Sequence, residues 1–464
     1  MDTSKIRFKE RVGYGLGDFA STLIFTAMTT FLTYFYTDVA GIAAATIGTV
    51  LFASRILDGL IDLGIGAVVD KTKSRHGKAR PWIKWMAIPF AASAVLLFSV
   101  PEMGSTATIV YVFITYNLVN IIYSAINVPY GALTSLMTQD QHQRTLLNIF
   151  RVLFSIAGTL LVSTATIRIV EAFGGGGLGW QLTFLFYGVL GALLFYVTFY
   201  SVKERVKPVD ETKNVPIKDG VQALFKNKYG GILVLTFILV TLYQTITVGS
   251  TIYYAQYVFH NKDLVGLLTI VKLVPVLIGI FLSAPLFKKF GKRNVARAGL
   301  VLAVIGSIIM LINPNSLNFI IVGAACRGLG YSAIAASAYA MFADTIEYGE
   351  WKTGLRTEGL TYSATSFGSK VGAGIGAALI GWVLAWGGYA GNQAVQSDAA
   401  ITSIKTLYIY IPLALTSIQI ILLSFYKLDK EFPQILRDLQ ERNFLNINKI
   451  KNEGASSTNI NEGF

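Results

Sequence analysis

Three charged residues stand at helical spacing inside a long apolar stretch, and they are the residues of this sequence best suited to do chemistry. Arg55, Asp58 and Asp62 lie in the segment 51–69, LFASRILDGLIDLGIGAVV. On an α-helix, positions three and four apart share one face, so the guanidinium and both carboxylates point the same way. One arginine cannot neutralise two carboxylates, and a charge at membrane depth is costly. The pattern predicts a cation site, and a purely structural Arg–Asp ion pair is the alternative.

Other apolar segments also carry polar residues. Asp18 lies in GYGLGDFAS and could bind hydroxyl groups or a coupling ion, because a carboxylate accepts from two hydroxyls at once. The glycines around it also allow a simple helix cap. Asn120, Ser124 and Asn127 fall on one stripe of a helix, where hydrogen bonding between helices is the alternative role. The further candidates are basic residues at membrane depth and aromatic residues that could stack on a sugar: Arg151, Lys272, Arg327, Lys370, Tyr34, Tyr123, Trp351 and Trp382. A cation from the C-terminal half could balance the N-terminal carboxylates across a central cavity.

Composition identifies the class of protein that must position these residues. The chain has 464 residues, of which 53% are hydrophobic and only 14% charged, against roughly 25% charged in soluble proteins. This is the composition of a polytopic membrane protein. The net charge of +13 comes from basic residues in short loops, a topology signal rather than a nucleic-acid-binding one. One cysteine and three separated histidines exclude a disulfide framework and offer neither a metal site nor a catalytic nucleophile, so no enzyme activity and no cofactor beyond a coupling cation is expected.

The apolar segments predict an all-α membrane protein with about twelve spanning helices, since each crossing needs roughly 20 residues. The predicted spans are 12–38, 43–70, 82–100, 107–137, 146–171, 179–202, 231–258, 264–288, 296–313, 315–345, 361–386 and 404–427. Lys and Arg gather at both termini and in every second loop, which places both termini in the cytoplasm of a cell-membrane protein.

The polar segment 203–230 divides the chain into two halves. We predict an N-terminal six-helix bundle (1–202), a cytoplasmic loop (203–230), a C-terminal six-helix bundle (231–427), and a tail (428–464) that forms a short helix followed by disorder. Matching basic loops in the two halves indicate a transporter whose bundles rock against each other. Charged loop residues are expected to hold the cytoplasmic side shut through salt bridges, with a solvated loop as the alternative. These gating candidates are Asp70, Arg75, Arg80, Asp140 and Arg144.

Four motifs spread along the chain resemble one family. They are GYGLGDFAS, RILDGLIDLGIGAVVDKTKSRHGKARPW, NVPYGALTSLMTQDQHQR and ADTIEYGEWKTGLRTEG. The chain resembles the glycoside–pentoside–hexuronide:cation symporters, the melibiose-permease-like branch of the major facilitator superfamily, and is most similar to xyloside and isoprimeverose carriers. The resemblance implies the major facilitator fold and symport of a sugar with H⁺ or Na⁺ across the lipid bilayer.

The same resemblance implies sugar contacts from Asp18, Asn127, Arg151 and Lys370, and cation coupling from Asp58 and Asp62 with help from Ser124. From their own positions, Tyr123 and Tyr130 in the polar segment that carries Asn127 are further candidate sugar contacts, and Arg55 on the stripe of Asp58 and Asp62 belongs to the candidate cation site.

The chain departs from melibiose-type carriers at several positions of these motifs. Those carriers have Asn where this chain has Ile61, Lys where it has Gly17, and an Asp and a Trp where it has Asn127 and Gly131. Loss of the Asn oxygen weakens a Na⁺ site but leaves a proton acceptor. We therefore expect proton coupling and import of a pentoside or other non-galactoside. Na⁺ coupling, efflux or exchange on the same fold, and a sugar sensor that does not transport remain as alternatives.

Overall fold

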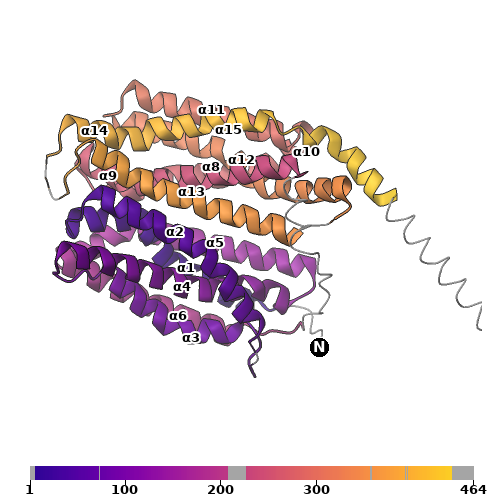
Figure 1. Ribbon diagram of the computed structural model, residues 1–464, viewed down its shortest axis with the longest axis horizontal. Coiled ribbons are helices and arrows are strands. Elements are labelled where there is room, and N and C mark those ends of the chain that lie inside the picture. The colour runs from indigo at the N-terminus through magenta and orange to yellow at the C-terminus, as the bar shows by residue number, and fades with distance from the viewer. Residues whose placement is uncertain are drawn as a thin grey trace, which may run out of the picture.

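The computed structural model describes residues 6–72, 74–206, 226–355, 358–391, 393 and 395–441, and every regular element within these ranges is a helix. The helices form two bundles, one from each half of the chain, which lie one above the other in Figure 1. The N-terminal bundle contains α1 (Phe8–Tyr34), the π-helix η1 (Phe35–Val39), α2 (Ala44–Asp70), α3 (Arg80–Leu97), α4 (Ser105–Met137), α5 (Gln141–Ala172) and α6 (Gly176–Ser201).

The C-terminal bundle repeats this organisation, with two of its membrane-crossing segments each built from more than one helix. It contains α8 (Lys228–Gly249), α9 (Thr251–Tyr257), α10 (Leu264–Phe290), α11 (Lys292–Ile312), α12 (Leu317–Thr353), α13 (Glu358–Trp386), α14 (Asp398–Lys405), the π-helix η2 (Thr406–Tyr410) and α15 (Ile411–Ser424). Residues 428–441 form a further helix, drawn in yellow in Figure 1.

Ten of the described helical segments are long and apolar enough to cross a membrane. α2 and α3 are not among these ten, although they are helices of the same bundle and cover two of the predicted spans. In α3 the two basic residues Arg80 and Lys84 lower the mean hydropathy of an 18-residue helix. The chain is therefore a multi-pass membrane protein, as its composition predicts.

The helix 428–441 packs on the C-terminal bundle. The Asp429 carboxylate accepts a hydrogen bond from the backbone N–H of Arg293 at 2.8 Å. The indole Nε1 of Trp351 donates to Asp438 Oδ2 at 2.8 Å, and Ile435 is buried. This helix is thereby fixed to α11 and α12 by polar contacts as well as by apolar packing.

The two bundles meet along pairs of helices that face each other. α2 packs along α13, α5 packs on α10, and α1 contacts α8 and α9. Backbones approach closely at Gly381, where an added Cβ would lie 2.3 Å from the carbonyl oxygen of Ala44. Only glycine permits this approach, so α2 and α13 touch tightly near the start of α2.

Candidate functional site

A cavity of about 380 Å³ lies between the two bundles. α1, α4 and α5 form one wall, and α8, α9, α10, α12 and η2 form the other. Hydroxyl side chains dominate the lining, which is Asp18, Ser21, Thr22, Phe25, Thr26, Thr29, Thr30, Tyr123, Ser155, Thr159, Ser163, Thr247, Val248, Thr251, Leu268, Thr269, Lys272, Leu273, Arg327 and Tyr408. A volume of this size falls within the range of small-molecule sites.

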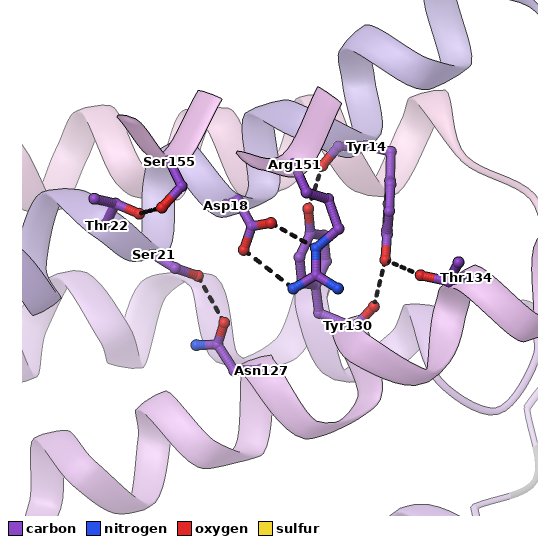
Figure 2. Close-up of polar contacts among 9 residues, drawn as sticks. All are labelled: Tyr14, Asp18, Ser21, Thr22, Asn127, Tyr130, Thr134, Arg151 and Ser155. Carbon is purple, nitrogen blue, oxygen red and sulfur yellow. Dashed lines mark hydrogen bonds and ion pairs between the residues drawn. The ribbon is translucent and has the colours of Figure 1, made fainter. Parts of the chain in front are cut away.

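Asp18, on the N-terminal wall of this cavity, forms an ion pair with Arg151. The Arg151 Nε donates to Asp18 Oδ2 at 2.5 Å and its Nη2 donates to Asp18 Oδ1 at 3.3 Å, as Figure 2 shows. This two-point contact fixes both side chains and cancels their charges. The carboxylate keeps free lone pairs that a ligand hydroxyl could reach.

Two stacked tyrosines support this ion pair. The rings of Tyr14 and Tyr130 lie 4.8 Å apart, and each hydroxyl donates to the other residue's backbone carbonyl. The Arg151 guanidinium lies 4.9 Å from the centre of the Tyr130 ring. An added Cβ on Gly17 would lie 2.4 Å from Cε2 of Tyr130, so the glycine at this position makes room for this ring.

Asn127 joins the same wall through α1. Its Oδ1 accepts from the Ser21 hydroxyl at 2.9 Å and its Nδ2 donates to the Tyr123 carbonyl at 3.0 Å (Figure 2). Thr22 and Ser155 share a hydrogen bond of 3.0 Å between α1 and α5. The structure thus brings together five of the six residues expected to contact sugar: Asp18, Asn127, Arg151, Tyr123 and Tyr130.

The sixth, Lys370, lies instead with the carboxylates of α2. Its Nζ is 2.5 Å from Asp62 Oδ2 and 3.2 Å from Asp58 Oδ2, and it donates to the Asp58 backbone carbonyl at 2.9 Å. Arg55 Nη1 lies 3.5 Å from the carboxylate oxygen Oδ2 of Asp58. We call Arg55, Asp58, Asp62 and Lys370 the Asp58 cluster.

The Asp58 cluster has two positive and two negative side chains. The sequence argument counted one arginine against two carboxylates and expected a cation from the C-terminal half to balance them; in the structure Lys370, 308 positions beyond Asp62, makes this contact. The lysine ammonium occupies a position among three oxygens in which a cation could otherwise sit. Because α2 and α13 belong to different bundles, these contacts also tie the bundles together. Asp62 Oδ1 is buried, and no described residue forms a hydrogen bond with it.

Ser124, the hydroxyl expected to help bind the cation, is buried on α4. A hydrogen bond ties α4 to α2: Asn117 Nδ2, seven positions before Ser124, donates to Ser54 Oγ at 2.9 Å. Ile61 is half-buried on α2 and brings no oxygen. Within the described residues, no group of three or more His, Cys, Asp or Glu side chains could hold a metal ion.

The C-terminal wall of the cavity carries two cations. Lys272 Nζ donates to Thr247 Oγ1 at 3.2 Å, and Arg327 Nη1 donates to the backbone carbonyl of Tyr408 at 2.8 Å. Arg327 is 2% exposed and lies against the rings of Tyr243 and Tyr408. The sequence marked both basic residues as candidates at membrane depth, and the structure places both on the cavity.

One end of the molecule, where α1 ends and α2 begins, is closed by a carboxylate that the sequence did not single out. Asp38 is buried in η1 and accepts hydrogen bonds from Thr37 at 2.6 Å, from the Tyr257 hydroxyl, and from the Tyr389 hydroxyl at 2.7 Å to each oxygen. Tyr253 shares a further bond of 2.9 Å with Thr37. The tyrosines belong to the C-terminal bundle, so this group, the Asp38 lock, joins the bundles. Burial raises the pKa of Tyr389, whose hydroxyl therefore keeps its proton and donates.

Polar contacts between the two bundles gather at the Asp38 end and at the Asp58 cluster. Besides the Asp38 lock they include Trp382 Nε1 to Thr49 Oγ1 at 3.1 Å and Arg168 to Asp263 at 3.8 Å. The structure is therefore closed at the Asp38 end.

The gating candidates lie at the opposite end, where α1 begins. Arg80 donates to the Phe199 carbonyl at 2.8 Å, Arg144 donates to the Thr138 carbonyl at 2.9 Å, and Asp140 caps α5 through the Gln143 N–H at 2.8 Å. All these partners belong to the N-terminal bundle. Arg75 is exposed in the α2–α3 loop, and the side chain of Asp70 lies outside the described residues.

Glu204 is a structural residue of this end that the sequence did not indicate. Its carboxylate accepts from the backbone N–H groups of Lys78, Ala79 and Arg80, each at 2.9 Å. A negative charge at the N-terminus of α3 is favoured by the helix dipole.

Of the aromatic candidates, Trp351 contacts Asp438, Trp382 lies at the α2 contact, and Tyr34 lines a second cavity of about 430 Å³ beside the Asp38 lock.

Two helical bundles around a polar cavity define the architecture of a secondary transporter. The sequence profile of the family described as MFS/sugar transport protein matches residues 13–430. The isoprimeverose transporter of Lactiplantibacillus pentosus is 35% identical over 443 residues, which cover 94% of this chain and 92% of the relative. A putative glycoside/cation symporter of Escherichia coli (strain K12) is 31% identical, with 94% of this chain and 95% of the relative covered.

The chain belongs to the glycoside–pentoside–hexuronide:cation symporter family of the major facilitator superfamily. It is a sugar transporter of the symport class and not an enzyme. Among solved structures, a bacterial homologue of the human lysosomal transporter Spinster, in an inward-facing and unoccupied conformation, superimposes with a TM-score of 0.64 at 15% identity. That similarity covers 92% of this chain and 97% of the other and concerns the fold alone.

Proposed function

We propose that this protein is a cell-membrane symporter that imports a small glycoside or pentoside together with a proton, by alternating access. The observation that carries the proposal is the Asp58 cluster, in which Lys370 from one bundle binds two carboxylates of the other. A change in the charge of those carboxylates changes the attraction between the bundles. Ion binding and bundle movement are thereby linked.

The direction of transport rests on the loop charges. Basic residues gather at the end where α1 begins, which places that end in the cytoplasm and the Asp38 lock on the outside. The described arrangement is then closed to the outside. Asp18, Arg151 and Asn127 bind the sugar from the N-terminal wall, in line with the family resemblance.

The coupling step follows from the contacts of Lys370. A proton delivered to Asp62 cancels its charge and weakens the 2.5 Å contact with Lys370, so the bundles can separate at this level. Sugar bound in the adjacent cavity favours one of the two arrangements. Because coupling is mutual, the proton raises sugar affinity by the factor by which sugar raises proton affinity.

A proton fits this site better than Na⁺. Na⁺ would have to displace the lysine ammonium from three oxygens, and Ile61 offers no further oxygen. The Na⁺-coupled symporter therefore remains the second candidate, to be separated from the first by experiment.

The test is uptake into proteoliposomes that contain the purified protein. A panel of labelled glycosides (isoprimeverose, methyl β-D-xyloside and methyl β-D-glucuronide) is offered under an imposed pH gradient or an imposed Na⁺ gradient. Accumulation of any panel member driven by the pH gradient alone supports the proposal. Accumulation that requires Na⁺ refutes proton coupling, and exit against the gradient, or absence of uptake and counterflow for the whole panel, refutes sugar import.

A further inference from the structure

The second cavity, of about 430 Å³, lies beside the Asp38 lock, and we call it the outer cavity. Residues of α1, η1, α5 and α6 line it from the N-terminal bundle, and residues of α9 and of the loop after α9 line it from the C-terminal bundle. Because both bundles contribute, the cavity has this shape only while the bundles are closed at this end. Its volume falls within the range of small-molecule sites.

The outer cavity continues the path of the central cavity. Along α1, Thr30 lines the central cavity and Tyr34 lines the outer one. Along α5, Ser163 and Ile167 have the same two positions. The members of each pair are four residues apart, so they share a helix face and lie about 6 Å from each other along the axis. A sugar that approaches the central cavity from outside therefore passes the residues of the outer cavity.

Glycines form the rim of the outer cavity. Gly175, Gly176 and Gly177 line it, and the last two are exposed. Gly175 and Gly176 have φ angles of 68° and 54°, which glycine adopts most readily. A Cβ added at any of the three positions would lie in open space among the described residues. The entrance beside α6 is therefore wide, and a small molecule can enter from outside while the bundles stay closed.

Aromatic side chains give the outer cavity an apolar surface. Tyr34, Trp180 and Tyr257 line it. The Trp180 ring is held in place by Phe35 and Phe98, whose ring centres lie 5.6 and 5.8 Å from its own. Aromatic rings present flat apolar faces, and the C–H face of a sugar ring can pack against such a surface.

Polar groups of several kinds surround these rings. Gln256 is a half-buried amide that can donate and accept, and Asp38 and Glu171 supply carboxylate oxygens. The ammonium of Lys262, from the C-terminal bundle, lies 5.5 Å from the centre of the Tyr34 ring. Donors and acceptors with charges of both signs suit the hydroxyl groups of an uncharged sugar better than they suit an ion.

From these observations we propose that the outer cavity is a second binding site, which takes an uncharged sugar from outside and holds the bundles closed at this end. The inference rests on the proposed function and adds a site to it. A sugar that contacts both bundles stabilises the closed arrangement by the factor 1 + [sugar]/Kd, which is about elevenfold at ten times the Kd of this site. External sugar at high concentration therefore slows the return of the empty carrier to its outward-open arrangement.

The first experiment counts the bound sugar. Purified protein is dialysed to equilibrium against labelled isoprimeverose and, separately, against labelled methyl β-D-xyloside, which are both uncharged. We expect two molar equivalents at saturation for at least one of them, one in each cavity.

A variant that fills the outer cavity locates the second equivalent. At Gly177 an added Cβ meets open space and φ is not positive, so Gly177→Trp places an indole in the cavity without removing a contact. This variant should bind one equivalent. Gly104→Trp is the matched control, because Gly104 has the same open space and precedes α4 at the same end of the bundle, where Tyr36 donates to the Leu97 carbonyl. It should bind two equivalents.

The second experiment measures the closing effect. The initial rate of uptake into right-side-out proteoliposomes is recorded under a fixed pH gradient while the external sugar concentration is raised. The wild-type rate should pass through a maximum and then fall. The rate of Gly177→Trp should rise to a plateau, and the rate of Gly104→Trp should follow the wild type.

Each other outcome overturns the inference. One equivalent bound by the wild type with both sugars refutes the outer site and leaves the symporter intact, so a Gly177→Trp protein that fails to fold does not hide the answer. Two equivalents in Gly177→Trp, or one in Gly104→Trp, place the second sugar elsewhere. A wild-type rate that only saturates refutes the closing effect, and a second equivalent found with methyl β-D-glucuronide alone refutes the uncharged ligand. Absence of binding and uptake for the whole panel refutes the proposed function together with this inference.

Discussion

Tyr389→Phe is the substitution that most directly tests how the Asp38 end is held closed. The Tyr389 hydroxyl lies 2.7 Å from each carboxylate oxygen of Asp38, and the ring stacks edge-on against Tyr253 and Tyr257. Phenylalanine keeps the ring and removes the donor. Tyr257 and Thr37 still donate to Asp38, so the lock is weakened and not abolished.

The size of the effect follows from the lost contact. A hydrogen bond to a charged acceptor contributes about 1.5–3 kcal/mol. When the bundles part at this end, water reaches both groups, so the hydroxyl stabilises only the closed arrangement. The ratio of closed to open molecules should fall roughly 10- to 150-fold, since about 1.4 kcal/mol corresponds to a factor of ten.

The populations can be measured by electron–electron double resonance. Spin labels are placed on exposed positions of the two bundles at the Asp38 end, Ala43 and Val395, after the one cysteine, Cys326, is changed to serine. We expect a population with a longer distance between the labels in the Tyr389→Phe protein. In the parent protein this population should be far smaller.

The control for this experiment is Tyr187→Phe. The Tyr187 hydroxyl shares a buried hydrogen bond of 3.0 Å with Thr166, and both residues belong to the N-terminal bundle. This variant should lose comparable local stability without a change in the distance distribution. The reasoning is refuted if Tyr389→Phe and Tyr187→Phe give the same distances as the parent protein.

Three further predictions concern other parts of the molecule. Gly17→Ala places a Cβ 2.4 Å from the Tyr130 ring and should destabilise the protein by about 1–3 kcal/mol, seen as a lower melting temperature in detergent; an unchanged melting temperature would show that the ring moves freely. Asp62→Asn removes the 2.5 Å ion pair with Lys370. It should abolish sugar accumulation driven by a pH gradient while tracer counterflow continues. Full accumulation by this variant would contradict a coupling role for Asp62. Glu204→Gln removes the negative charge from the N-terminus of α3 and should cost about 1 kcal/mol, with Glu204→Asp as the conservative comparison; equal melting temperatures for all three proteins would contradict the capping role.

The helices were predictable because apolar segments of spanning length are local features. The predicted span 82–100 corresponds to α3 at Arg80–Leu97, and 107–137 to α4 at Ser105–Met137. The predicted twelve crossings exceed the ten described segments that are long and apolar enough to span; in α3, Arg80 and Lys84 make the helix polar near its start.

The candidate site was only partly predictable. The shared face of Asp58 and Asp62 follows from helical spacing. The sequence also predicted that a cation of the C-terminal half balances these carboxylates, but which of the basic candidates does so depends on how α2 and α13 pack. Asp38 stands at the last position of a predicted span, where a carboxylate normally meets water. Its burial arises only when tyrosines of the other bundle cover it.

The helix 428–441 has a practical consequence for measuring motion. Asp429, Asp438 and Ile435 fix it to α11 and α12, so it turns with the C-terminal bundle as one body. An optical probe on the exposed residue Glu441 sits at the tip of this lever, and its displacement exceeds that of the helices within the membrane. Energy transfer from that probe to one on the N-terminal bundle would follow each transport cycle from outside the lipid.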